Sequence, residues 1–332
     1  GQGGLLDVMV PADFAASREI WLAFAAPAPG GPATAAGHGR LSEDGLRLEG
    51  FETVFLGDGA PGGRHFGARL VEAAEDGIYL TTGDRGTGPE GMPGRGQHHR
   101  RHPIGLGAGV LGHAARGTGV SVEPPPDSAT QRHQTTGDRG TGPEGMQAQD
   151  PASTLGKVIR LDREGGAWQA RVHSMGHRNL QGAALDLGGR LLTVEHGAQG
   201  GDEVNAPEQG RNYGWPVISY GVNYDGAKIG EGTGKAGMEK PLHYWDPSIA
   251  PSGLMVYSGA LVPDWRGDVF TGSLKSDFLS RLDPDAAGPG GWAEERIAAP
   301  ETGRVRDVVE GPDGAIWFLS VTDGAVYRMA PQ

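Results

Sequence analysis

Two chemically complementary segments lie close together in the middle of this 332-residue chain. Residues 176–182 read GHRNLQG and are basic and rich in amides, whereas residues 195–203 read EHGAQGGDE and are acidic and rich in glycine. Guanidinium and amide groups bind anions, and carbonyl and carboxylate oxygens are the ligands that a hard cation prefers. The two segments could therefore hold a polyanionic ligand beside a metal ion.

A histidine and an aspartate earlier in the chain could carry out proton chemistry. His65 stands in GRHFGARL, directly before a predicted strand, and Asp84 follows the next predicted strand in the turn GDRG. Neutral imidazole has a pKa suited to accepting a hydroxyl proton. Taken alone, however, a single histidine is more often structural, and an Asp between glycines is an ordinary turn residue.

The composition indicates a protein built from many short strands. With 60 Gly and 24 Pro, turns are frequent, which argues against a helical bundle. The formal net charge of −12 argues against a nucleic-acid or anionic-membrane partner and fits a small uncharged substrate. The absence of cysteine excludes disulfides, thiol catalysis and Cys-ligated metals, and no apolar run approaches membrane-spanning length.

Predicted strands come in pairs that are joined by Gly-containing turns. The pairs are residues 68–73 with 78–82, 182–186 with 190–195, 254–257 with 268–272, and 305–310 with 315–320. Repeats of short antiparallel strands favour a β-propeller, although a β-sandwich with long loops would show the same pairs. The chain begins directly in strand-like sequence, without an initiator Met or a signal peptide, so we expect it to be a mature form or a fragment.

One stretch does not fit this pattern. Residues 81–92, TTGDRGTGPEGM, recur letter for letter at residues 135–146, which indicates a local duplication. Residues 93–134 lack apolar periodicity, so we expect a mobile excursion there. Within it, GAGVLG at 107–112 has the glycine spacing of a dinucleotide-binding turn but follows no strand, and the histidines 98, 99 and 102 are better explained by a solvated basic loop than by a metal site.

The motifs taken together resemble the soluble PQQ-dependent aldose sugar dehydrogenases, calcium-bearing quinoproteins related to soluble glucose dehydrogenase. Besides the two segments above, RNYGWP at 211–216 and WDPSIAPSG at 245–253 carry the resemblance. It implies an all-β chain forming a six-bladed β-propeller that is incomplete at the N-terminal blade. We expect residues 1–332 to form this single domain, with an insertion at 93–146.

The resemblance also assigns site residues. His65 matches the general base, Asp84 the carboxylate that orients it, and Arg178 a catalytic cation. PQQ carries three carboxylates and needs several fixed cations. The positions that match cofactor contacts are Gln2, His65, Arg178, Asn179, His196, Ser248, Lys275, Arg304 and Arg306. Arg304 and Arg306 alternate along one predicted strand and should therefore share a face.

Calcium is the second expected cofactor. By resemblance, the carbonyls of Gly197 and Ala198 bind the calcium that also holds the quinone, and Glu203 with the carbonyl of Tyr213 holds a second, structural calcium. The chain departs from the glucose dehydrogenase branch at Arg64, where that branch has an acidic residue. It departs again at His196, and near the sugar at His243 and Asp246, so the preferred sugar stays open.

The implied activity is oxidation of an aldose at C1 to the lactone, with electrons passed to an external acceptor. We expect no nucleic-acid partner and no membrane span, and a periplasmic or secreted location. A non-catalytic propeller that serves as a binding module, or an inactive fragment of such an enzyme, is the alternative. Retention of the base and the cations favours the enzyme.

Overall fold

The computed structural model describes residues 2–74, 77–86 and 145–331, and nearly all regular structure in them is β-strand. The N-terminal sheet contains β1 (Leu5–Met9), β2 (Glu19–Ala28), β3 (Gly31–Leu41) and β4 (Leu48–Leu56). The second contains β5 (Gly67–Glu72), β6 (Ile78–Thr82), β7 (Lys157–Glu164) and β8 (Ala167–Met175). The third contains β9 (Leu180–Leu185), β10 (Leu191–Glu195), β11 (Asp202–Asn205) and β12 (His243–Trp245).

Two more sheets complete the described chain. The fourth contains β13 (Pro251–Val256), β14 (Val269–Ser273), β15 (Leu279–Gly288) and β16 (Gly291–Ile297), and the fifth contains β17 (Val305–Glu310), β18 (Ile316–Ser320) and β19 (Ala325–Met329). Every strand pairs antiparallel with its neighbours in the sheet. All four strand pairs predicted from the sequence are present, within a few residues of the expected bounds.

Glycine-rich turns produce these short antiparallel strands. Glu164 of β7 pairs with Ala167 of β8, which leaves a two-residue turn made of Gly165 and Gly166. Both glycines have positive φ, 58° and 88°, the conformation that a type I′ hairpin turn requires. Tight turns of this kind keep consecutive strands in one sheet.

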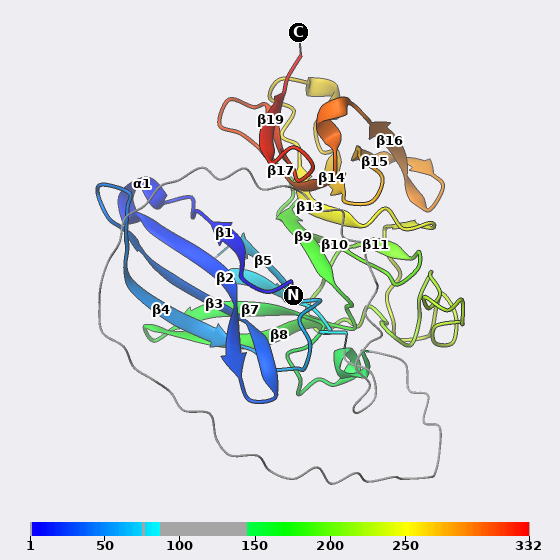
Figure 1. Cartoon of the computed structure of the whole chain (residues 1–332), viewed down its shortest axis with the longest axis horizontal. Coiled ribbons are helices and arrows are strands. Elements are labelled where there is room, and N and C mark those ends of the chain that lie inside the picture. The colour runs from blue at the N-terminus through cyan, green and yellow to red at the C-terminus, as the bar shows by residue number, and fades with distance from the viewer. Residues whose placement is uncertain (1, 75–76, 87–144, 332) are drawn as a thin grey trace, which may run out of the picture. The chain divides into compact units, whose positions relative to one another are not determined.

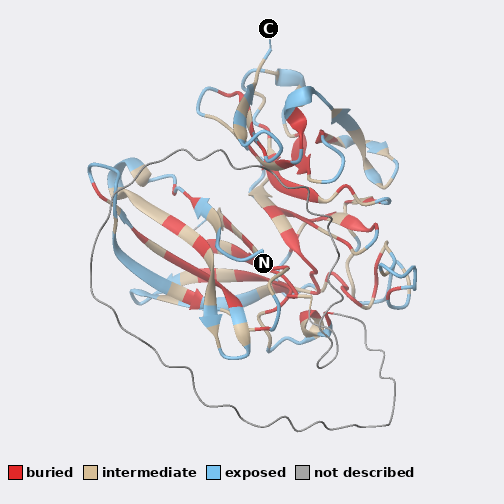
Figure 2. Cartoon of the chain, viewed as in Figure 1, coloured by how far each residue is buried: buried red, intermediate tan, exposed pale blue. Residues whose placement is uncertain are grey.

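The sheets bury their apolar faces against one another (Figure 2). One core cluster, which includes Trp21, Leu80 and Leu161, joins the first two sheets. A second joins the third and fourth sheets, and a third joins the fourth and fifth through residues such as Phe270 and Phe318. Face-to-face packing of this type is the main stabilising contribution in an all-β protein.

The first strand of each sheet packs on the first strand of the next sheet, in the order β1, β5, β9, β13 and β17 (Figure 1). The chain is thus an all-β protein with five blades in a propeller arrangement. No comparable packing joins β17 to β1 within the described ranges. The expected sixth blade is not seen in the described ranges, in which the N-terminal sheet has four strands and the C-terminal sheet has three.

A partly buried ionic cluster links four of these inner strands. Arg69 of β5 contacts Asp307 of β17 at 2.8 Å and Asp7 of β1 at 3.3 Å. Its Nε also donates to the carbonyl of Gln181 on β9. The Asp7 carboxylate also accepts the backbone N–H of Leu70. Arg69 and Leu70 of β5 therefore connect the second sheet to the first sheet through Asp7, and Arg69 connects it to the fifth sheet through Asp307.

The helices are all short: α1 (Phe14–Ser17), η1 (Met146–Gln149), η2 (Pro263–Trp265) and η3 (Pro300–Thr302). Across the described ranges, none has the length and apolarity needed to cross a membrane. The expected excursion at 93–134, with its glycine and histidine motifs, lies outside the described residues. The described parts of the two repeat copies are residues 81–86 of the first and residues 145–146 of the second, which leads into η1.

Candidate functional site

His65 and Asp84, the two candidates for proton transfer, form a buried pair next to the start of β5 and the end of β6. His65 precedes β5 with a left-handed φ of 52°, and Asp84 follows β6. The imidazole Nδ1 lies 2.7 Å from Asp84 Oδ1, and the backbone N–H of His65 donates to Gln2 Oε1 at 2.9 Å. Positive φ is uncommon outside glycine and occurs where surrounding contacts enforce it. The sequence-predicted residues Gln2, His65 and Asp84 are therefore brought together.

The surroundings keep the imidazole neutral. Burial and the positive charge of Arg178 lower the pKa of His65 to about 4, although the charge and the hydrogen bond of Asp84 act to raise it. Burial alone would raise the pKa of Asp84, but the charge and hydrogen bond of His65, together with Arg178, bring it below its usual value. A neutral imidazole that donates Nδ1–H to a carboxylate carries its lone pair on Nε2. This pair has the arrangement of a general base with its orienting acid.

Arg178 lies beside this pair, in the turn before β9. Its carbonyl accepts the backbone N–H of Asp84 at 2.7 Å, and its guanidinium Nη1 donates to the carbonyls of His196 and Gly197. The guanidinium centre is 5.1 Å from the ring of Trp215. Its Nε is buried and has no hydrogen-bond partner among the described residues. An unpartnered buried N–H is costly, so this cation is prepared for a further acceptor.

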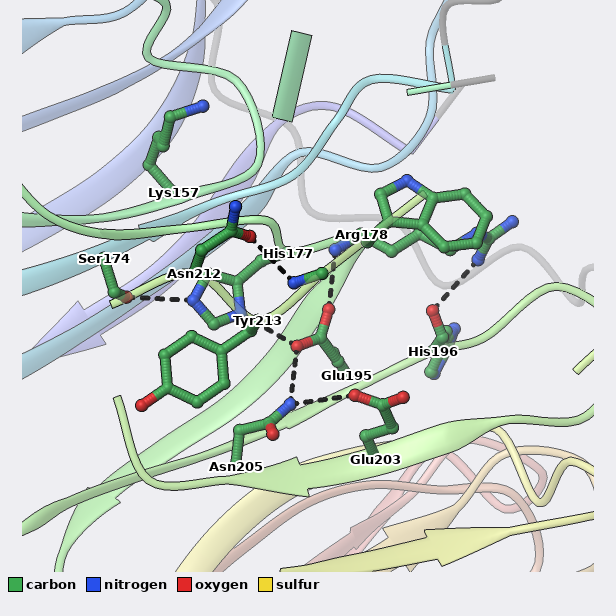
Figure 3. A network of polar contacts seen from close by, with 12 residues as sticks. Lys157, Ser174, His177, Arg178, Glu195, His196, Glu203, Asn205, Asn212 and Tyr213 are labelled. Atoms are coloured by element: carbon green, nitrogen blue, oxygen red, sulfur yellow. Dashed lines mark hydrogen bonds and ion pairs between the residues drawn. The ribbon is translucent and has the colours of Figure 1, made fainter. Parts of the chain in front are cut away.

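A buried polar network holds the turn that carries Arg178 (Figure 3). Glu195 at the end of β10 accepts the backbone N–H of Arg178 and contacts His177 Nδ1 at 2.9 Å. The other imidazole nitrogen, Nε2, lies 2.9 Å from the hydroxyl of Ser174. Asn205 Nδ2 donates to both Glu195 and Glu203. The network fixes the backbone of residues 177–178 against the end of β10.

The predicted cofactor residues Asn179, His196 and Arg306 belong to one set of polar contacts. Asn179 Oδ1 accepts from Gln181 Nε2, and the Gln181 Oε1 accepts from Arg306 Nη1 at 2.9 Å. Asn179 Nδ2 lies 3.5 Å from His196 Nδ1, and His196 Nε2 lies 2.7 Å from the carbonyl of Pro251. Burial lowers the pKa of His196.

Ser248 is tied to the glycine-rich turn by a residue that the sequence motifs did not single out. The buried carboxylate of Asp202 accepts the N–H of Gly197 on one oxygen, and the Ser248 hydroxyl with the N–H groups of Ile249 and Ala250 on the other. Ser248 is thus connected through Asp202 to the turn at 197–198. Four bonds on one carboxylate make this connection rigid.

Lys275 and Arg304 are less well defined by contacts. Both are exposed, and no side-chain partner is recorded for either within the described ranges. The expectation that Arg304 and Arg306 alternate along a strand is wrong in one respect. Arg304 has a φ of 47° and lies just before β17, which begins at Val305, so strand alternation does not apply to it.

Three of the four predicted calcium ligands, Gly197, Glu203 and Tyr213, line a small cavity together with Glu195, whereas Ala198 does not line it. Burial and the negative charge of Glu195 together raise the pKa of Glu203 to about 8. The Tyr213 ring stacks on His177 at 4.9 Å. Across the described residues, no group of three or more acidic or imidazole side chains could hold a metal. Three of the four expected ligands are carbonyls, a type that this finding does not address.

Sequence reasoning missed two kinds of site residue. Glu195 and Asp202 lie inside the quoted acidic segment, yet only the fold shows that they are buried and bind backbone N–H groups. Trp215 lies inside the quoted NYGWP motif, and only the fold places its indole N–H on Asp84, at 2.8 Å. An aromatic residue in a Gly- and Pro-rich loop was the one sequence signal available.

The chain is similar to several known sugar dehydrogenases. The chain is 32% identical over 350 residues to the aldose sugar dehydrogenase YliI of Escherichia coli K12, an alignment that spans 100% of this chain and 78% of that protein. It is 26% identical to quinoprotein glucose dehydrogenase B of Acinetobacter calcoaceticus over 55% of this chain and 51% of that one. A crystal structure of a glucose dehydrogenase superposes with a TM-score of 0.77 at 33% identity, covering 100% of this chain and 84% of the other.

The family match covers most of the chain. Residues 1–102 and 126–328 match the Glucose / Sorbosone dehydrogenase family, and the segments that carry His65, Asp84, Arg178 and the turn at 197–198 all fall inside those ranges. The chain therefore belongs to the Glucose / Sorbosone dehydrogenase family.

Proposed function

We propose that this protein oxidises aldose sugars at C1 to the lactone, with PQQ as its redox cofactor and Ca²⁺ as its metal. The observation that carries the proposal is the buried His65–Asp84 pair beside Arg178, because it combines a neutral base with a partly unpartnered cation. Sugar dehydrogenases of this family, such as the Escherichia coli relative, are named for this class of substrate.

The residues present fit an anionic quinone. Arg178 has a buried Nε without a partner, and Arg306, Asn179 and His196 line the same polar set beside it. Lys275 and Arg304 are exposed cations free to meet peripheral carboxylates. When bound, PQQ would supply the acceptor for the hydride that leaves the sugar C1. Arg178 would hold the quinone end and stabilise negative charge there.

His65 would take the proton. Its Nε2 carries the lone pair, and Asp84 keeps Nδ1 protonated and the ring in one orientation. Removal of the C1 hydroxyl proton makes the imidazole positive, and the carboxylate at 2.7 Å stabilises that charge. Arg178 opposes protonation before the sugar arrives, so the base enters the reaction neutral.

The donor set also fits a small hard cation. Glu203 is a buried carboxylate near Glu195 without a basic partner recorded in the described residues, and the carbonyl oxygen Oδ1 of Asn205 is buried and unpartnered. Cations prefer such oxygen-rich sites. We assign Glu203 and the carbonyl of Tyr213 to one Ca²⁺, and the carbonyls of Gly197 and Ala198 to the Ca²⁺ that would hold the quinone. In this structure the Gly197 carbonyl accepts from Arg178.

We also propose that the complete propeller has six blades. The two sheets at the break between β17 and β1 expose apolar side chains, Val309, Leu319 and Val326 on one and Leu5 and Val8 on the other. Exposed apolar faces of this kind mark contact surfaces. An experimental structure of the full protein that shows a closed five-bladed ring would contradict this.

The lactone-forming reaction would require an external electron acceptor, and we place the protein in the periplasm or outside the cell. Recovery of the native protein in the cytoplasmic fraction after osmotic shock would argue against that location.

The test is reconstitution. The purified chain is incubated with PQQ and Ca²⁺, and dye reduction is followed with a panel of aldoses, with His65→Ala as the control. We expect sugar-dependent turnover in the parent that is lost in His65→Ala and after chelation of calcium. Stoichiometric PQQ binding without calcium would contradict the assigned metal role. Absence of PQQ binding and turnover under all conditions would favour the non-catalytic propeller.

A further inference from the structure

The indole of Trp215 contacts both halves of the proposed reaction site. Its Nε1–H donates to Asp84 Oδ2 at 2.8 Å, and its ring lies 5.1 Å from the guanidinium centre of Arg178. The side chain is buried, with 8% of its surface exposed. One residue therefore contacts the acid that orients the base and the cation that faces the cofactor.

The two oxygens of Asp84 have different partners. Oδ1 accepts from His65 Nδ1 at 2.7 Å and from the N–H of Gly86 at 2.8 Å, while Oδ2 accepts from Trp215. A carboxylate bonded through only one oxygen can rotate about its Cβ–Cγ bond. A donor on the second oxygen fixes this rotation and hence the direction in which Oδ1 points.

The backbone of Trp215 is held from two sides. The backbone N–H of Trp215 donates to the carbonyl of Gly176, and its own carbonyl accepts from Gln149 Nε2 at 2.6 Å. Gln149 and Asn212 also exchange two side-chain hydrogen bonds. The loop of Trp215 is thus anchored both to the turn that carries Arg178 and to η1.

A glycine covers the Asp84–Trp215 hydrogen bond. Gly145 has a φ of 90°, and a Cβ added there would lie 2.3 Å from Trp215 Nε1 and 2.6 Å from Asp84 Oδ2. No side chain fits at this position without moving one partner of the bond. Gly145 belongs to the second repeat copy, whereas Asp84 belongs to the first, so each copy supplies one part of this arrangement.

We propose that Trp215 is a positioning residue for the base: its indole N–H holds Asp84 against His65 and its ring holds Arg178 next to them. This rests on the proposed function for the roles of His65 and Arg178. The charged groups that face His65 are Asp84, Arg178 and Arg64. Of these, Asp84 is the one whose orientation Trp215 controls through a hydrogen bond.

The test compares two Trp→Phe variants of the full chain. Trp215→Phe removes the N–H and keeps an aromatic ring beside Arg178. Trp21→Phe is the matched control, because Trp21 is also buried and its Nε1–H also donates to a carboxylate, Glu19, at 2.7 Å. The pKa and tautomer of His65 are measured by NMR of its imidazole in the cofactor-free protein, and PQQ affinity and turnover are measured in the reconstituted protein.

We expect Trp215→Phe to lower the pKa of His65, because Asp84 is no longer held against the imidazole and stabilises its positive charge less. Turnover should fall at least tenfold. A raised pKa would show that Asp84 keeps its contact with the ring without the indole, and would contradict the proposal. An unchanged His65 pKa and turnover, with only the loss of melting temperature also seen in Trp21→Phe, would overturn the proposal.

A second variant retains the Trp215 side chain but should displace it from Asp84. Gly145→Ala should separate Trp215 from Asp84 and perturb the His65 resonance in the same direction as Trp215→Phe, whereas Gly91→Ala, at the same position of the first copy, should leave it unchanged. An equal change of the His65 resonance in Gly145→Ala and Gly91→Ala would also count against the proposal. If the His65 shift is seen but the parent neither binds PQQ nor oxidises sugars, the positioning role stands and the proposed function fails.

Discussion

Replacing Asp84 by Asn tests the base most directly. Among the described residues, the carboxylate accepts the N–H groups of His65, Gly86 and Trp215. A carboxamide has one acceptor oxygen and one donor NH₂ group. If its oxygen stays on the His65 side, its NH₂ faces the indole N–H of Trp215. If it flips, the NH₂ faces Nδ1 of His65 and moves the imidazole proton to Nε2.

The magnitude follows from the lost charge. A carboxylate within hydrogen-bond distance raises the pKa of a histidine by about one to three units. Losing it weakens His65 as a proton acceptor, so turnover should fall roughly 10-fold to 1,000-fold even if the ring does not move. A flipped carboxamide would add to this loss, because the proton on Nε2 removes the lone pair that the sugar needs. Stability should also fall, by about 2–4 kcal/mol, since hydrogen bonds to a buried charge are lost.

The assay is dye-linked turnover of the PQQ- and calcium-loaded protein, with chemical denaturation for stability. The duplicated segment supplies the control: Asp138 occupies the same position in the second repeat copy, and Asp138→Asn should change neither quantity. Full activity in Asp84→Asn, combined with loss in Asp138→Asn, would refute the assignment and move the reacting residue to the second copy.

Three further predictions concern the base, the insertion and a buried lysine. His65→Gln should lower turnover by about two to four orders of magnitude while PQQ affinity changes far less. Because the folded-state pKa of His65 is about 4 against the usual 6.5, the unfolded chain binds more protons between these values. The contribution of His65 to the free energy of unfolding should therefore be fully present above pH 6.5 and should fall by about 3 kcal/mol towards pH 4. The free energy of unfolding of His65→Gln, measured from denaturation curves, should not show this decrease. Deleting residues 93–146, which gives the same sequence as deleting 87–140, leaves one repeat copy and should leave stability level or slightly higher, since loop-closure entropy depends weakly on length. An unfolded deletion variant, or protease cleavage outside residues 93–134 first, would show that the excursion is packed structure. Lys157→Met should cost about 2–5 kcal/mol in denaturant unfolding, because its fully buried ammonium donates to the carbonyls of Gln147, Ala148 and Leu155. The exposed Lys240→Met should change stability by less than about 0.5 kcal/mol, and a similar cost in both variants would contradict the reasoning.

Much of the local structure could be predicted because it depends on neighbouring residues. Glycine turns such as Gly165–Gly166 and apolar alternation define strands over a few residues, and these signals placed β5, β6, β9 and β10 within two residues of their observed bounds. The number of blades could not be predicted in this way. It depends on which sheet packs on which, and the described chain contains four four-stranded sheets and one three-stranded sheet.

Strand periodicity also has a limit that Arg304 illustrates. Alternation predicts a shared face only while both residues have extended backbone. At Arg304 the contacts of the preceding turn, including its N–H to Asp277 Oδ1, impose a left-handed conformation. A period-two argument reads residue types and cannot detect that the first arginine lies outside the strand.

The sequence by itself determined the kinds of group at the site and the family to which the chain belongs, because residue types in short motifs are local properties. Only the tertiary structure decided the partners. Asp84 lies 131 positions from Trp215 in the chain, yet their side chains form one hydrogen bond. The pKa of His65 depends on burial and on Arg178, both of which arise when the second and third sheets pack together. Proton affinity, orientation and unpartnered N–H groups are set by such long-range contacts, which no motif contains.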